Sequence, residues 1–334
     1  MAGIAQMKDQ SGKATGWEVS QAIPFPTKIS SDHDARNANA EAKAAMLTSR
    51  ELEIRADARL VYFRLWKAQE RARLLEEKKN AIEQHLKLTR AATRSDSFMK
   101  IHLVKTEGDL DLLKNEITVA EQERREAQIQ MAEYLNRSPQ DFKPVSKEFV
   151  PSAIPSDEAS ARPALLEAKR WDLESLKARE SEAKASWMPD FSVRYREAGG
   201  TGMNPRYSEI MLGASVPFLF FWQPRAESGK AAAERLEGEY RFDLESRRIE
   251  SRRASLVNKA ESLKKQLDQF RVKIVPNAEK RVRLVYNVAP RDLETLQDHR
   301  EAMESLPELK LKALDLRDQY EETVAELEKL GGRK

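Results

Sequence analysis

Side chains that could perform chemistry are few and scattered in this chain of 334 residues. There is no cysteine, which excludes disulfides, thiol nucleophiles and cysteine-based metal sites. The four histidines, His33, His85, His102 and His299, lie far apart and in no metal-ligand spacing. We interpret them as solvated helix histidines, and the alternative is a metal site that combines His102 with His299.

Motifs that would indicate catalysis are also missing. The chain contains no Walker loop, GxGxxG, HExxH or GxSxG, and carboxylate pairs such as Glu76–Glu77 are typical of an ordinary helix surface. Its 58 Lys and Arg nearly balance 55 Asp and Glu, whereas a nucleic-acid binder would show a strongly basic stripe. We therefore predict a protein that is not an enzyme and has no cofactor, no metal site and no nucleic-acid partner.

Most of the chain has the apolar spacing of long coiled-coil helices. Apolar residues recur at steps of seven, or of four and three, which marks a helix seam. These positions are Leu47, Ile54, Val61, Ala68, Ala72, Leu75, Ile82 and Leu86, and then Leu256, Leu263, Leu267, Phe270 and Ile274. The pattern predicts helices over 31–93, 97–136, 225–288 and 291–330, and Pro307 should kink the last helix or start a new segment.

The two sets of seam positions coincide at an offset of 195, which indicates an internal repeat. We expect a first repeat over 1–137, a proline-rich connector over 138–162 and a second repeat over 163–334. The second repeat opens with a helix over 163–187 that has no counterpart in the first. The chain also begins without the basic and apolar layout of a signal peptide. We therefore expect an N-terminal truncation, with in-frame coding sequence upstream of Met1.

A different period, of two residues, precedes the second pair of helices. Phe191, Val193 and Tyr195 alternate with polar residues, and Ile210 and Leu212 do so after a turn-rich stretch. This predicts hairpins over 190–218 and, more weakly, over 3–25, so four strands per chain. Four strands with one apolar face cannot close by themselves, but three chains would supply a twelve-stranded transmembrane β-barrel. The alternative is a small soluble sheet that caps a helical bundle.

These segments together resemble the TolC-like outer membrane efflux protein family. In the second repeat the resemblance rests on SWMPDFSV (186–193), LGASVPF (212–218), ESGKAAAERL (227–236) and VPNAEKRVRLVYNVAPRDLETL (275–296). In the first repeat it rests on ARLVYFRLWKAQERARLLEE (58–77) and EITVAEQERREAQIQMAEYLNRSP (116–139). The resemblance implies a homotrimer in which long helices form an α-barrel that continues the outer-membrane β-barrel across the periplasm. It also implies a periplasmic adaptor and an inner-membrane pump of the RND or ABC type as partners.

The resemblance places the adaptor contact at the turns between paired helices, the tunnel tip. The corresponding residues are Arg94, Asp96, Tyr286, Ala289 and Asp292. The family's usual Tyr-x-x-Gly is here Tyr286-Asn287-Val288-Ala289, with alanine in place of glycine. Asp96 and Asp292 are suited either to lie beside helix N-termini or to line a narrow, cation-selective entrance.

The apolar run SVPFLFFWQPR (215–225) then falls at the membrane rim, where aromatic rings sit among lipid headgroups. We predict rim positions for six aromatic residues, which are Trp17, Phe25, Phe218, Phe220, Phe221 and Trp222. The functional hypothesis is a passive outer-membrane conduit for efflux or type I secretion, located in the outer membrane and periplasm. The alternative is a soluble coiled-coil scaffold or interaction protein.

Overall fold

The computed structural model describes residues 2–8, 14–93, 99–139, 149–155, 163–198, 207–215, 222–286 and 293–331. Within these ranges the chain forms long helices and one four-stranded sheet, which confirms the mainly helical fold with a small β part. The chain divides into two compact units. The first unit comprises Met1–Thr48 and Arg162–Ile249, and the second comprises Ser49–Ala161 and Glu250–Lys334.

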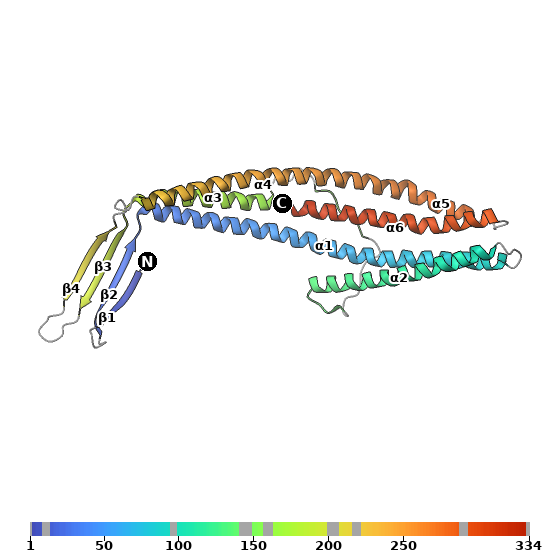
Figure 1. Ribbon diagram of the computed structural model, residues 1–334, viewed down its shortest axis with the longest axis horizontal. Coiled ribbons are helices and arrows are strands. Elements are labelled where there is room, and N and C mark those ends of the chain that lie inside the picture. The colour runs from blue at the N-terminus through green and yellow to red at the C-terminus, as the bar shows by residue number, and fades with distance from the viewer. Residues whose placement is uncertain are drawn as a thin grey trace. The chain divides into compact units, whose positions relative to one another are not determined.

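The sheet lies in the first unit. Its strands are β1 (Ala2–Lys8), β2 (Ala14–Ile23), β3 (Phe191–Ala198) and β4 (Tyr207–Ala214). They are antiparallel and lie in sequence order, so two hairpins are joined through β2 and β3 (Figure 1). This central pairing brings Ile23 opposite Phe191 and Val19 opposite Tyr195. Each hairpin contributes one edge strand, β1 or β4.

Three helices of the first unit adjoin the sheet in sequence. They are α3 (Ala164–Lys184), which ends in the 3-10 turn η2 (Ala185–Trp187), and the opening parts of α1 (Pro26–Thr93) and α4 (Trp222–Gln269). Helix α1 begins at Pro26, earlier than the expected residue 31, and α4 carries Pro224 in its first turn. Both prolines suit a first turn because the backbone N–H groups there have no intrahelical partner.

Close packing between α3 and α4 depends on a glycine. A Cβ atom added at Gly238 would lie 2.5 Å from Cδ1 of Leu176 and 3.5 Å from Cδ1 of Leu173. Glycine in the middle of a helix is unfavourable relative to alanine by about 1 kcal/mol. Because Gly238 has no side chain, the leucines of α3 can approach the backbone of α4. This close packing compensates for the unfavourable helix propensity of the glycine.

The second unit contains the coiled-coil seams. Here the remainder of α1 packs on α2 (Met99–Tyr134) through a core that includes Leu75, Ile82 and Leu86. The remainder of α4 packs on α6 (Leu293–Lys329) through a core of Ala260, Leu263, Tyr320, Val324 and Leu327. The predicted seam positions at 75, 82, 86 and 263 are therefore buried.

Two predicted seam residues are largely exposed in one chain. Leu47 is 62% exposed and Ile54 is 51% exposed, so the expectation that they lie in a seam is wrong for the single chain. Their spacing continues the pattern of α1, but the buried core of α1 and α2 begins further along, at Leu65 and Ala68. A periodic pattern identifies the apolar face of a helix and does not identify what covers it.

The last helices differ from the expectation at two prolines, Pro276 and Pro307. Between α4 and α5 (Val275–Tyr286) lies a π-helical segment, η4 (Phe270–Ile274), which ends two residues before Pro276. Proline has no N–H to donate to the carbonyl four residues earlier, and the wider π turn accommodates that loss. By contrast, α6 runs through Pro307 as one helix, so the expected new segment does not form there.

In the described part of the chain, no helix combines the length and the apolar character needed to cross a membrane.

Candidate functional site

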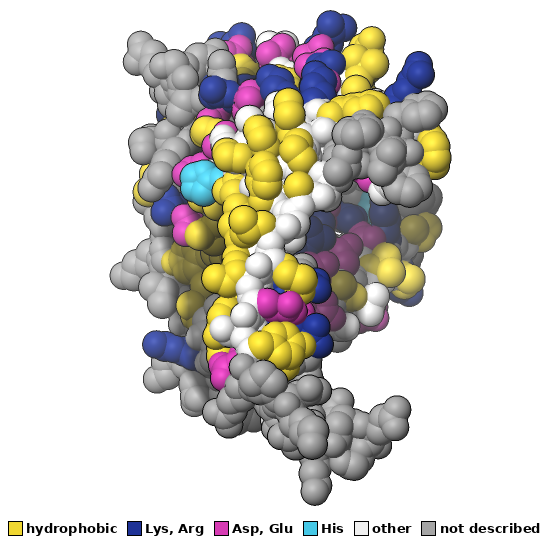
Figure 2. Space-filling model, turned by 90° about the vertical axis from the view of Figure 1, so that its left-hand side faces the viewer, with side chains coloured by type: hydrophobic (Ala, Val, Ile, Leu, Met, Phe, Trp, Pro, Cys, Tyr) yellow, Lys and Arg dark blue, Asp and Glu magenta, His cyan; other side chains and the backbone are white. Residues whose placement is uncertain are grey.

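One face of the sheet is apolar and exposed. The register places Ile4, Trp17, Val19, Ile23, Phe191, Val193, Tyr195, Ile210 and Leu212 on the same face. On β4, Ile210 is 70% exposed and Leu212 is 79% exposed, although both lie among apolar side chains of the same face. Figure 2 shows hydrophobic side chains gathered in a continuous column with charged groups beside it. A surface of this kind marks an interaction site with another protein or with lipid.

The opposite face of the sheet is charged. Arg194 pairs with Glu18 at 3.2 Å across β2 and β3, and Arg196 pairs with Glu209 at 3.5 Å across β3 and β4. These residues alternate with the apolar residues along each strand, because successive side chains of a strand point to opposite faces. The sheet therefore has one face suited to an apolar environment and one suited to water.

Aromatic side chains lie toward both ends of the apolar face. At the end near the hairpin turn of β1 and β2, the rings of Trp17 and Tyr195 are 5.1 Å apart. At the end next to α1, Phe191 pairs with Ile23. Six residues separate Trp17 from Ile23, which corresponds to about 20 Å along a strand. An outward apolar band in membrane barrels is about 25 Å tall and is bordered by aromatic residues on both sides.

The predicted rim aromatics are thus distributed over different places. Trp17 lies near the far end of the sheet, whereas half-buried Phe25 directly precedes α1. Trp222 is the first residue of α4 and is 60% exposed. Phe218, Phe220 and Phe221 lie outside the described residues.

A polar junction joins the sheet to the helices. The Asp190 carboxylate accepts hydrogen bonds from the backbone N–H of Phe25 (3.1 Å) and from Lys28 Nζ (2.8 Å). Its backbone N–H donates to Ser215 Oγ at 2.9 Å, and Ser215 N–H donates to the Asp190 carbonyl at 2.8 Å. Burial opposes ionisation of Asp190, but the hydrogen bonds from Lys28 and Phe25 outweigh it and lower the pKa. Asp190 thereby ties together the starts of α1 and β3 and the end of β4.

The Pro-Asp pair at 189–190 lies in SWMPDFSV, one of the segments that carry the family resemblance. A sequence signal was available, because aspartate directly after a proline and before a strand is typical of a turn that bonds nearby backbone groups. Its partners could not be identified, since Phe25 and Lys28 lie far away in the chain.

The predicted tip residues are at the limits of the described chain. Tyr286 is the last residue of α5. Arg94, Asp96, Ala289 and Asp292 lie outside the described residues.

The histidines differ from their predicted surroundings. His85 on α1 and His299 on α6 are only 5% and 7% exposed, and their rings stack with centroids 6.4 Å apart. The expectation of solvated histidines is therefore wrong for this pair and holds for exposed His33. His299 thus stacks on His85. Among the described residues no group of three or more His, Asp or Glu side chains is placed to hold a metal ion.

Burial governs the protonation of the histidine pair. It lowers the pKa of His85 to about 4, and nearby Arg300, His299 and His102 contribute in the same direction. Burial also lowers the pKa of His299. Arg300 itself forms ion pairs with Asp109 of α2 and with Glu304, 2.8 Å away on its own helix. Near neutral pH the histidines are therefore uncharged packing residues between helices.

Two joined hairpins and long paired helices together characterise the fold of this chain. No protein-family model matches the sequence, and no curated protein matches it either. Solved structures do match. The open state of the MtrE outer membrane channel of Neisseria gonorrhoeae is 18% identical with a TM-score of 0.83, over 99% of this chain and 79% of that one.

Two further structures agree. The CusC transmembrane channel is 14% identical with a TM-score of 0.81, over 100% of this chain and 82% of that one. The CmeC outer membrane channel of Campylobacter jejuni is 13% identical with a TM-score of 0.73, over 99% of this chain and 76% of that one. The chain therefore has the fold of these outer membrane channels, and the resemblance to TolC-like proteins is confirmed at the level of the fold.

Proposed function

We propose that this chain is one protomer of an outer-membrane channel that serves a tripartite efflux pump or a type I secretion system. It would act as a passive conduit between the periplasm and the outside of the cell. Energy would come from an inner-membrane pump of the RND or ABC type, linked through a periplasmic adaptor.

The observation that carries this proposal is the sheet. Its apolar face is exposed, its other face carries the ion pairs Glu18–Arg194 and Arg196–Glu209, and β1 and β4 are edge strands. Edge strands present unpaired backbone groups, which are unfavourable in lipid unless another strand pairs with them. Three copies of a four-stranded sheet would close into twelve strands, an even number as in bacterial outer-membrane barrels.

In this proposal the helices of three protomers form the periplasmic α-barrel. The exposed apolar residues Leu47 and Ile54 on α1 would then be covered by a neighbouring protomer. The tip residues Arg94, Asp96, Tyr286, Ala289 and Asp292 remain the proposed contact with the adaptor. The rim aromatics remain a proposal as well, with Trp17 assigned to the outer border and Phe25 and Trp222 to the periplasmic border.

The soluble scaffold is not favoured. The structures that share this fold are described as outer membrane or transmembrane channels, and none of these three is described as a scaffold.

Membrane fractionation tests the proposal directly. We expect the protein in the outer-membrane fraction, extracted only by detergent, as a trimer that separates into protomers on heating. After reconstitution into a planar bilayer it should conduct ions. Recovery in the aqueous fraction as a monomer or dimer, with no conductance, would contradict the channel function and favour the scaffold.

A further inference from the structure

A pocket in the second unit has the features of a ligand site. It has a volume of about 680 Å³ and lies between α1, the connector segment 149–155, α4 with η4 and α5, and α6. Ligand pockets in proteins commonly measure about 300–1,000 Å³ and combine an apolar lining with a few converging polar groups. The apolar lining here includes Trp66, Leu267, Phe270 and Leu314.

The connector segment closes one side of this pocket and is firmly held. Ser152 donates two hydrogen bonds to the buried carboxylate of Glu321, one of them from its backbone N–H at 3.1 Å. Tyr320 Oη donates to the Ser152 carbonyl at 2.6 Å, and an Arg317 guanidinium N–H donates to the Phe149 carbonyl. The pocket wall formed by Pro151, Ser152 and Ala153 is therefore held in place by hydrogen bonds to α6.

Basic side chains outnumber acidic ones around the pocket. Its lining contains Arg73, Lys264, Arg271, Lys310 and Arg317 but only two acids, Glu70 and Asp268. Each acid lies beside an arginine, since Arg73 bonds Glu70 at 2.9 Å and Arg271 is 3.6 Å from Asp268. The balance of charge is therefore positive, which favours an anionic group.

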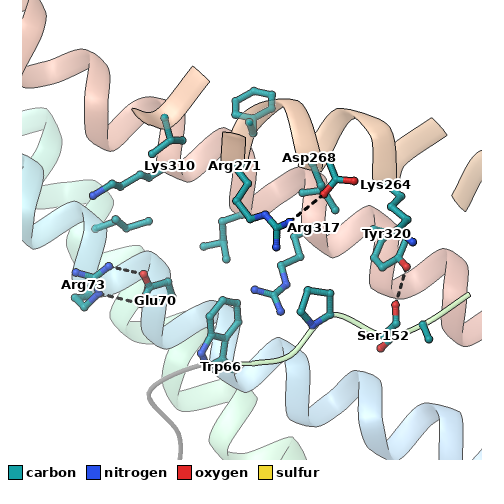
Figure 3. Close-up of a pocket in the computed structure, with 18 residues that line it drawn as sticks. Trp66, Glu70, Arg73, Ser152, Lys264, Asp268, Arg271, Lys310, Arg317 and Tyr320 are labelled. Carbon is teal, nitrogen blue, oxygen red and sulfur yellow. Dashed lines mark hydrogen bonds and ion pairs between the residues drawn. The ribbon is translucent and has the colours of Figure 1, made fainter. Parts of the chain in front are cut away.

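The basic and aromatic groups converge on the same space. Figure 3 shows Arg271 and Arg317 reaching from their helices toward Trp66, whereas the Lys310 side chain extends away from them. The Arg317 guanidinium lies 4.7 Å from the centre of the Trp66 ring. Arg271 and Phe270 both belong to the π-helical segment, and single π turns inside α-helices frequently occur at functional sites.

We propose that this pocket binds a small amphipathic anion, with its apolar body against Trp66 and its anionic head group near Arg271 and Arg317. The ion pair of Arg271 with Asp268 is 3.6 Å long and the Arg271 side chain is 80% exposed, so an anion can compete for this cation. The site goes beyond the conduit function and does not depend on it, because helices and the connector of one unit form it.

The experiment uses the purified protein in nanodiscs of zwitterionic lipid and the probe anilinonaphthalene sulfonate, whose fluorescence rises on transfer to an apolar site. Empty nanodiscs measure the contribution of lipid. We expect saturable binding of one probe per protomer, with quenching of Trp66 emission that is lost in Trp66→Phe. The uncharged anilinonaphthalene should bind more weakly.

Two substitutions in the same π-helical segment distinguish binding in the pocket from a general effect of positive charge on probe binding. Arg271→Ala should weaken probe binding about tenfold, the loss of one charge-assisted contact. Lys273→Ala is the matched control, since Lys273 is exposed in the same segment and is not among the residues that line the pocket. It should change the affinity by less than about twofold.

Three outcomes would overturn the proposal. They are equal effects of the two substitutions, a signal no larger than that of empty nanodiscs, and binding that occurs only after the assembled protein has been dissociated. The last outcome would mean that a second copy of the chain covers the pocket. A protein that binds the probe but does not conduct would refute the conduit and leave the anion site standing.

Discussion

Leu212 and its neighbour Met211 offer a test of the sheet at the scale of single residues. Leu212 lies on the apolar face, and Met211 lies opposite Arg194 on the charged face. An arginine on the lipid side of a membrane barrel costs about 2–4 kcal/mol near the middle of the bilayer, whereas the inner face tolerates it. We predict that Leu212→Arg strongly reduces the amount of heat-dissociable trimer in the outer-membrane fraction.

Met211→Arg is the control for that prediction, because it adds the same side chain one residue away on the other face. It should leave the trimer yield close to that of the unchanged protein. If both substitutions reduce the yield equally, the apolar face does not contact lipid.

The buried histidine pair predicts a response to pH. Because burial lowers the pKa of His85 from an ordinary 6.5 to about 4, the folded state favours the uncharged ring. The stability that this group contributes is fully present above pH 6.5 and is lost as the pH falls toward 4, by up to roughly 3 kcal/mol. We predict that His85→Gln makes the midpoint of thermal unfolding less dependent on pH between 6.5 and 4.5.

The matched substitution is His33→Gln, at an exposed histidine of the first unit. It measures the effect of removing a histidine that does not belong to the buried pair. An identical pH dependence for His85→Gln would show that His85 does not titrate with folding in this range.

At the scale of elements, the packing of α3 on α4 through Gly238 can be tested. Gly238→Val places a stiff, branched side chain against Leu176, and overpacking of this kind costs about 1–3 kcal/mol. We predict a lower unfolding midpoint and faster amide hydrogen exchange in α3. The comparison is Gly229→Val on the same helix, since a Cβ there meets no atom within 4 Å.

Both substitutions replace a glycine of α4 by valine and so change its helix propensity equally. The difference between their unfolding midpoints therefore isolates the contact with α3. Equal stability of the two variants would mean that α3 moves away from Gly238 without loss of packing.

The helices were also the elements that sequence periodicity predicted best. Heptad steps such as Leu75, Ile82 and Leu86 depend on neighbours within one helix, and the structure buries all three. The π-helical segment Phe270–Ile274 was not predicted, because a regular seam continues through Phe270 and Ile274 and gives no sign of a wider turn. Pro276 was the local signal that could have indicated it.

For the whole molecule, the proposed conduit makes a prediction about ion selectivity. If Asp96 and Asp292 of each protomer surround the tunnel entrance, their carboxylates favour cations there. We predict that the double substitution Asp96→Ala and Asp292→Ala lowers cation selectivity in planar-bilayer recordings. Asp243→Ala, at an exposed position on α4, serves as the control.

Unchanged conductance and selectivity in the double variant would assign the two aspartates to the helix N-termini instead. That outcome would leave the channel itself unaffected, because conduction by the variant would still be observed.

The sequence by itself determined the long helices, the four amphipathic strands and the absence of a recognisable catalytic motif. These features depend on periods of 3.5 and 2 residues and on residue types, all of which are local. Only the tertiary structure decided which distant residues meet. The pairing of Ile23 with Phe191, the anchoring of Phe25 and Lys28 on Asp190, and the stacking of His85 on His299 each join residues far apart in the chain. Such contacts depend on how whole helices and strands pack, and a single sequence carries no periodic signal for them.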